Sequence, residues 1–266
     1  MSEPVLTALL IANGRSTKEL IDYDPLRLPP ELVTVGMNFA YRYYEQIGWF
    51  PSMYGFCDVK TLENKVEELR DLVARHPETT FYAAPRVNQL CVRYTPEILE
   101  NIKRAKRDPK FEEELGLEKL RRTVSIELPE APNLLPIKHG PTGVRLSQVL
   151  IDKGIKRILM IGADADYVER IPEAEDHPDD GHLPEEFRRL IISRDVKTNP
   201  NYFCDDYQRV GDIYSTPRAA SSHISGWTQV AELAKEAGVE VINCSPTSRI
   251  KDFKRRGLAE CLSELT

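Results

Sequence analysis

The sequence predicts an α/β fold: a doubly wound, Rossmann-like, mostly parallel sheet with helices on both faces and an inserted lid segment. Short apolar runs, typical of buried strands, alternate with segments of helical periodicity. The first runs end on polar residues, and 266 residues suffice to bury one large core. We expect a single nucleotide-binding domain over residues 1–266, with the lid at about 168–222.

The first predicted strand lies in Val5–Lys18, VLTALLIANGRSTK, where an apolar run ends abruptly at Asn13 and Gly14. Gly14 permits a positive φ or a close approach to the backbone, and Ser16 or Thr17 can cap the next element of the chain. Ligands of α/β sheets usually bind at this end of the first strand, although a tight turn with nothing bound is the alternative. Neither GxGxxG nor GxxxxGK[ST] is present, so the dinucleotide and P-loop fingerprints are not met.

Further apolar runs predict the other strands. Leu32–Asn38 and Ser52–Asp58 end on polar residues, and Thr79–Ala84 is followed by Pro85, which closes it. Short apolar runs of this kind are typical of strands buried on both faces. We also predict strands at Val124–Leu128, Arg157–Gly162 and Val239–Cys244.

Helical spacing of apolar residues fills the intervals between these strands. A helix follows a cap at Thr61, a second runs from Pro141 to Gly154, and a third covers Ser225–Ala237. A last helix starts at Asp252, and the proline-flanked segment APNLLP is predicted to be a connection.

Two polar stretches form the predicted lid. Glu169–Glu186 is acidic, contains proline and has few apolar residues, which favours a mobile surface excursion. Asn199–Ser222 lacks regular periodicity and carries Tyr202, Tyr207 and Tyr214. Phenols can donate to phosphate oxygens while their rings exclude water, so this stretch predicts a cover over a ligand. Ordinary loop packing is the alternative.

Polar residues gather at one edge of the predicted sheet. Because the carboxyl ends of parallel strands meet at the same edge, we expect Asn13, Asn38, Asp58, Asp164 and Ser245 to lie there together. The residues themselves therefore predict a nucleotide-sized binding site, without specifying the chemistry.

Composition narrows the class of protein. The chain has 36 Lys and Arg against 42 Asp and Glu, a net charge of −6, which argues against nucleic acid as a partner. Its five cysteines are scattered without a CxxC pair, which indicates neither a disulfide framework nor a zinc site and fits the cytoplasm. No signal peptide or membrane-spanning run is evident, so any membrane association is expected to be peripheral.

Several short motifs, in order, resemble the bacterial CMP-sialic-acid-dependent sialyltransferases of the Campylobacter type and the related domain of motility-associated flagellin glycosyltransferases. They are IANGRSTKELIDYDPLRLPPE, Asn38 within VGMNFAYRYYEQIGWFPSMYGFCD, PTGV from Pro141, ILMIGADADY, and the helix-strand-SPTS unit near the end. The resemblance implies a GT-A-like domain and a glycosyltransferase. The enzyme would move an acidic sugar, a sialic-acid-like nonulosonic acid or Kdo, from a CMP-linked donor to a surface-glycan or protein acceptor. Oligomers are compatible with it.

The resemblance also implies roles for individual residues. His223 falls near the family's catalytic histidine, a general base that acts with inversion and without an obligatory metal. His139 stands near a family arginine, and Asp58 stands where the family has an asparagine. Thr142 and Gly143 match a Ser-Gly pair that holds an anion at a helix N-terminus. The donor-binding residues implied are Asn13, Gly14, Asn38, Asp58, Thr142, Gly143, Asp164, Tyr167, Tyr202, Tyr207 and Ser245.

Two alternatives stay open. Asp164 and Asp166 form a DxD-like pair that, with Asp58, could hold Mg²⁺ or Mn²⁺. The chain would then be a metal-dependent nucleotide-sugar transferase or an enzyme like hydroxymethylpterin pyrophosphokinase. The second alternative is a nucleotide-binding module without catalysis.

Overall fold

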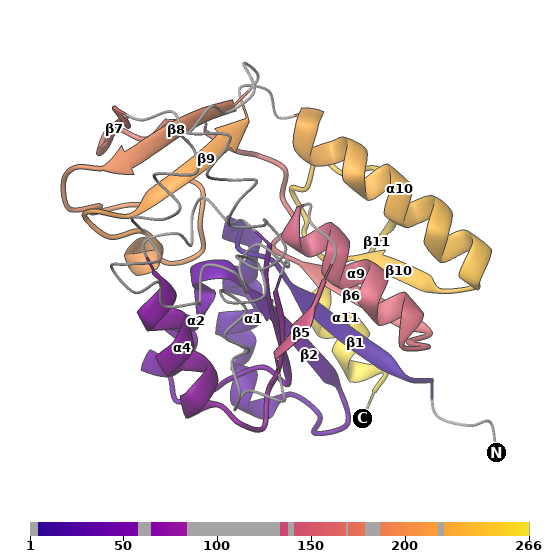
Figure 1. The fold of residues 1–266 in the computed structure, drawn as a ribbon. Coiled ribbons are helices and arrows are strands. Elements are labelled where there is room, and N and C mark those ends of the chain that lie inside the picture. The colour runs from indigo at the N-terminus through magenta and orange to yellow at the C-terminus, as the bar shows by residue number, and fades with distance from the viewer. Residues whose placement is uncertain are drawn as a thin grey trace, which may run out of the picture.

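A computed structural model describes residues 5–57, 65–83, 134–137, 141–168, 170–178, 187–217 and 221–265. Its centre is an eight-stranded, fully parallel sheet in the order β11-β10-β6-β1-β2-β3-β4-β5 (Figure 1). The strands are β1 (Thr7–Ile11), β2 (Val33–Met37), β3 (Met53–Phe56), β4 (Thr80–Ala83), β5 (Leu134–Pro136), β6 (Arg157–Ile161), β10 (Glu240–Asn243) and β11 (Lys254–Arg255).

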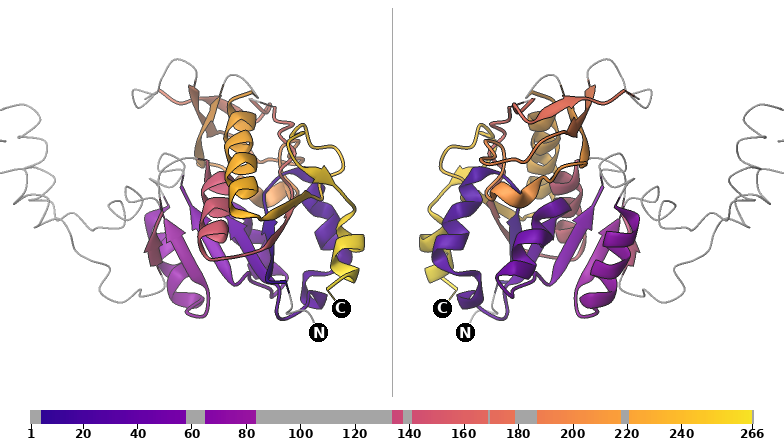
Figure 2. Two further views of the ribbon diagram at one scale, coloured as in Figure 1. Left: turned by 90° about the vertical axis from the view of Figure 1, so that its right-hand side faces the viewer. Right: turned by 90° about the vertical axis from the view of Figure 1, so that its left-hand side faces the viewer.

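Helices cover both faces of this sheet, as Figure 2 shows. Alternate side chains of β1 point to opposite faces. Leu9 and Ile11 pack in one apolar cluster with residues of α1, α2, α4 and α11, whereas Ala8 and Leu10 pack in a second with residues of α9 and α10. The predicted doubly wound α/β class is therefore confirmed. The helices are α1 (Lys18–Tyr23), α2 (Tyr41–Gln46), α4 (Val66–Arg75), α9 (Thr142–Asp152), α10 (Ser221–Ala237) and α11 (Leu258–Ser263).

A small antiparallel sheet forms the insertion between β6 and α10, in the order β7-β8-β9. Its strands are β7 (Ala174–Asp176), β8 (Phe187–Ile192) and β9 (Ile213–Pro217). A core of its own, which includes Leu190, Ile192 and Tyr214, holds it together. The insertion predicted at about 168–222 is therefore present, and its stretches without regular periodicity contain the strands β7 and β9, which strand pairing and this core hold in place.

Other boundaries differ from the predictions. The described part of the segment predicted to be a connection, Leu134–Pro136, forms the edge strand β5, whose Leu134 pairs with Phe81 of β4. The last helix starts at Leu258 rather than Asp252, because β11 intervenes. Two elements are too short for periodicity to reveal: β5 has three residues and β11 two. The helix α10 begins at Ser221, four residues before the predicted start.

Some predicted features cannot be compared. The strand at Val124–Leu128, the cap at Thr61, and the residues Asp58 and His139 lie outside the described ranges. Within those ranges, no helix is both long enough and apolar enough to span a membrane.

Candidate functional site at the carboxyl edge

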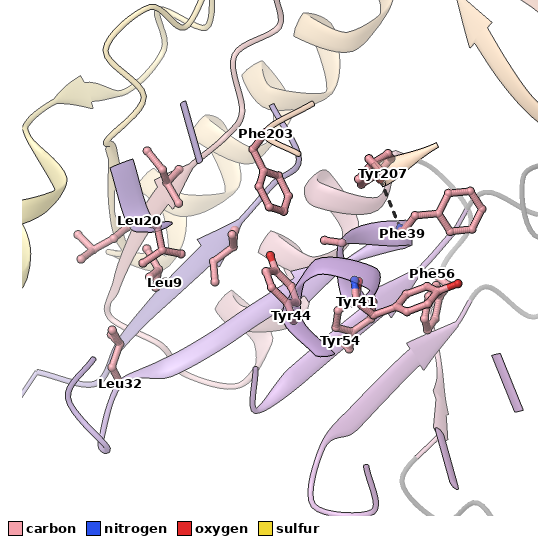
Figure 3. Packing of buried hydrophobic residues seen from close by; sticks show 14 of the residues in the cluster. Leu9, Leu20, Leu32, Phe39, Tyr41, Tyr44, Tyr54, Phe56, Phe203 and Tyr207 are labelled. Atoms are coloured by element: carbon pink, nitrogen blue, oxygen red, sulfur yellow. Dashed lines mark hydrogen bonds between the residues drawn. The ribbon is translucent and has the colours of Figure 1, made fainter. Parts of the chain in front are cut away.

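The insertion reaches the end of β1 through Tyr207, which belongs to a 3-10 turn, η4 (Asp205–Tyr207). The amide Nδ2 of Asn13 donates to the Tyr207 hydroxyl at 2.8 Å. The backbone N–H of Phe39, in the 3-10 turn after β2, η3 (Asn38–Ala40), donates to the same oxygen at 3.3 Å (Figure 3). The backbone N–H of Phe203 donates to the Asn13 carbonyl at 3.2 Å. Tyr207 therefore joins the carboxyl ends of two neighbouring strands.

Asn38 extends this polar group to α9. Its backbone is left-handed, with φ of 54°, a conformation that Asn tolerates better than most residues. Its side-chain oxygen accepts from the hydroxyl of Thr142 at 3.1 Å, and Thr142 is the first residue of α9. The Asn38 carbonyl accepts from Tyr54 at 2.9 Å. Asn13 and Asn38, which were predicted to lie at one edge of the sheet, thus belong to one hydrogen-bonded group with Thr142 and Tyr207.

Two hydrogen-bonding atoms of this group are unused. The Asn13 Oδ1 atom is buried and has no hydrogen-bond partner in the described part of the chain. A buried acceptor without a partner is costly. The Tyr207 hydroxyl accepts two hydrogen bonds, and no acceptor is found among the described residues for its own proton. Within the described residues, the group therefore holds one acceptor and one donor without a partner.

The phenols near this group are protonated at neutral pH. Burial raises the pKa of Tyr207 and of Tyr202 well above the ordinary value, and for Tyr202 the neighbouring phenol of Tyr167 adds to the effect. The rings of Tyr202 and Tyr207 stack with centroids 3.8 Å apart. Each hydroxyl is consequently a neutral donor, which suits a negatively charged ligand oxygen.

Both carboxylate oxygens of Asp164 face the turn after β1. Its Oδ2 accepts from the backbone N–H of Ser16 at 2.9 Å, and its Oδ1 accepts from the Ser16 hydroxyl. Ser245 is fully buried, and its Oγ accepts from the N–H of Gly162 at 2.9 Å. Asp164 and Ser245 therefore fasten the ends of β1, β6 and β10 to one another.

Gly14 is required for this closure. Its φ of −69° is ordinary, so no left-handed conformation explains it. A Cβ atom at Gly14 would lie 2.5 Å from both the Asp164 carboxylate and the Gly162 carbonyl. Gly14 therefore permits the close approach of two strand ends.

Asp166 lies in a more exposed ion-pair cluster. Its carboxylate is 2.7 Å from Arg15 and 2.8 Å from Arg249, one guanidinium on each oxygen. Each of the four oxygens of Asp164 and Asp166 therefore has one partner within the described residues. Among the described residues, no group of three or more His, Cys, Asp or Glu side chains is arranged to hold a metal.

Gly143 lies where α9 packs against α10, the helix that contains His223. A Cβ atom on Gly143 would lie 3.1 Å from the Trp227 ring, so the glycine lets the two helices approach. His223 is in the first turn of α10, four residues before Trp227. About one helical turn separates these two positions along α10. His223 therefore lies about one helical turn closer to the N-terminus of α10 than the point where α10 packs against the start of α9.

Sequence patterns did not indicate two residues that support the site, Arg42 and Asp212. Their side chains form a buried ion pair behind Tyr207. Arg42 lies in an aromatic stretch and Asp212 in a turn, and no local motif marks either residue.

Comparison with known proteins gives little beyond this geometry. No protein-family model matches the chain, and no curated protein matches it. Among solved structures, the chain is similar to the MAf glycosyltransferase from Magnetospirillum magneticum AMB-1, with a TM-score of 0.42 and 14% sequence identity. The match covers 96% of this chain and 34% of that protein, so the chain spans about a third of its length.

Proposed function

We propose that this chain is a glycosyltransferase that moves an acidic sugar from a CMP-linked donor to a glycan or protein acceptor. The observation that carries the proposal is the polar group of Asn13, Tyr207, Asn38 and Thr142, with an unused acceptor on Asn13 and an unused donor on Tyr207. It lies at the carboxyl edge of a parallel sheet, where nucleotides usually bind.

Each member of the group suits one part of such a donor. The free Oδ1 of Asn13 can accept from a ribose hydroxyl or the cytosine amine, and Asn38 precedes Phe39, whose N–H shares the Tyr207 hydroxyl with Asn13. Thr142 and Gly143 open an eleven-residue helix, whose N-terminal amides and dipole favour a carboxylate or phosphate. The neutral phenols of Tyr207 and Tyr202 can donate to phosphate oxygens without adding charge.

We assign the general base to His223. As the bond between the anomeric carbon and the CMP phosphate breaks, CMP leaves with the electron pair, and the acceptor oxygen bonds to that carbon from the opposite side. The imidazole takes the proton of the acceptor hydroxyl. An ordinary histidine pKa near 6.5 suits this task around neutral pH.

A thermal-shift panel of CMP, CDP, UDP, GDP and ATP, each with and without Mg²⁺ or Mn²⁺, tests the donor. A ligand that binds the folded state raises the apparent melting temperature. We expect CMP to raise it without a metal, and Asn13→Ala to reduce the shift. A shift that requires a diphosphate and a metal would instead favour the metal-dependent alternative and disprove the CMP assignment.

Transfer from a CMP-sugar tests the base. His223→Ala should lower the rate by about 10²- to 10⁴-fold, the usual contribution of a general base, while CMP binding persists. His177→Ala, in the insertion, serves as the matched control and should keep wild-type activity. Undiminished turnover by His223→Ala would rule out the base assignment. Binding of CMP without any turnover by the wild-type chain would favour a module that only binds nucleotide.

A further inference from the structure

The insertion is attached to the main domain by a buried ion pair. Arg42 lies on α2, and Asp212 lies in the turn before β9, 170 residues away. Their side chains are 2% and 1% exposed. The guanidinium donates from Nη1 to Oδ2 at 2.5 Å and from Nη2 to Oδ1 at 3.3 Å. This forked geometry is one that Arg makes and Lys cannot.

The charges of the pair are compensated on all sides. Asp212 also accepts from Lys65 at 2.8 Å and from the backbone N–H of Arg209 at 2.8 Å. Arg42 is 3.4 Å from Glu68, and its guanidinium lies 4.4 Å from the centre of the Phe39 ring. Buried pairs are stabilising only when their remaining hydrogen bonds are satisfied in this way, and losing one partner is costly.

Arg42 also binds the residue that completes the candidate site. Its Nη1 donates to the backbone carbonyl of Tyr207 at 2.9 Å. The phenol of the same residue contacts Asn13 and the N–H of Phe39. One guanidinium therefore holds the backbone of Tyr207. Through Asp212, it also holds the end of the loop that runs from Tyr207 to β9.

We propose that Arg42 and Asp212 are positioning residues that hold the base of the insertion so that the Tyr207 hydroxyl faces the nucleotide. This inference rests on the proposed function only for the identity of the ligand. The insertion is accordingly anchored at residues 203–212.

Hydrogen exchange without any ligand tests the anchor. Arg42→Lys keeps the charge but cannot span both Asp212 and the Tyr207 carbonyl, and Asp212→Asn keeps the size but removes the charge. In both variants we expect amide protection over residues 203–212 to fall at least tenfold, with the strand β6 unchanged. Arg209→Gln is the control, because the Arg209 side chain pairs with Asp206 at the surface of the same insertion. Unchanged protection in both variants would overturn the anchor.

A double-mutant cycle with CMP tests the positioning role. Arg42→Lys should weaken CMP binding about tenfold, the value of one hydrogen bond to a charged group. In a Tyr207→Phe background, which has no hydroxyl to position, Arg42→Lys should cause little further loss. A merely structural role predicts that the two losses multiply, and that result would overturn the proposal. If the wild-type chain does not bind CMP, the proposed donor is wrong, while hydrogen exchange still decides the anchor.

Discussion

Replacement of Asp164 by alanine distinguishes a structural carboxylate from a ligand-binding one. The substitution removes the acceptor of the buried Ser16 N–H and of the Ser16 hydroxyl. An unsatisfied buried donor costs about 1–3 kcal/mol, and a hydrogen bond to a charged group contributes about 1.5–3 kcal/mol. Because the hydroxyl can turn to another partner, we expect the free energy of unfolding to fall by about 3 kcal/mol.

Urea denaturation followed by circular dichroism would measure this loss, and a thermal scan should show a melting temperature lower by roughly 6–12 °C for a chain of this size. Asp166→Ala is the matched control. Its carboxylate is more exposed and pairs at the surface with Arg15 and Arg249, so its loss should cost less than about 1 kcal/mol. Equal effects of the two substitutions would refute the assignment of Asp164 to the closure of the strand ends.

Three further predictions concern packing and ionisation. Gly14→Ala should cost about 1–3 kcal/mol in urea unfolding, because its Cβ would meet the Asp164 carboxylate and the Gly162 carbonyl. Gly257→Ala, whose Cβ is unobstructed, should cost less, about 1 kcal/mol or under, because only the N-cap of α11 is weakened. Burial opposes the charge of Asp212, but Arg42 outweighs it and holds the pKa below the ordinary value. Asp212 therefore adds stability above about pH 4, and this contribution is lost as the pH falls through its folded-state pKa. The free energy of unfolding of Asp212→Asn, measured from about pH 7 to about pH 2, should consequently fall less with acid than that of the wild-type chain. Burial raises the pKa of Cys204 to about 12, so alkylation of that thiol at pH 8, followed by mass spectrometry, should be roughly 10³-fold slower than in the unfolded chain.

The central strands and the sheet edge that carries the site could be predicted from the sequence alone. Strands β1, β2, β3, β4, β6 and β10 are buried between two layers of helices, so each appears as a local apolar run. Parallel strands must end at one edge, and this rule alone predicted that Asn13 and Asn38 would lie near each other. The helix that begins at Thr142 was predicted from local spacing, and Thr142 is the third residue of this polar group.

Only the tertiary structure decided which of the polar residues at that edge hydrogen-bond to neighbouring turns and which keep an unused hydrogen-bonding atom. Asp164 and Ser245 have the same sequence signature as Asn13, a polar residue after a buried strand, but their hydrogen bonds are directed at neighbouring turns. The choice of Tyr207 among the predicted tyrosines, and the pairing of Arg42 with Asp212 across 170 residues, also depend on packing. Local periodicity reports which face of an element is buried, whereas these contacts arise only when distant segments meet, and for that reason no stretch of the sequence encodes them by itself.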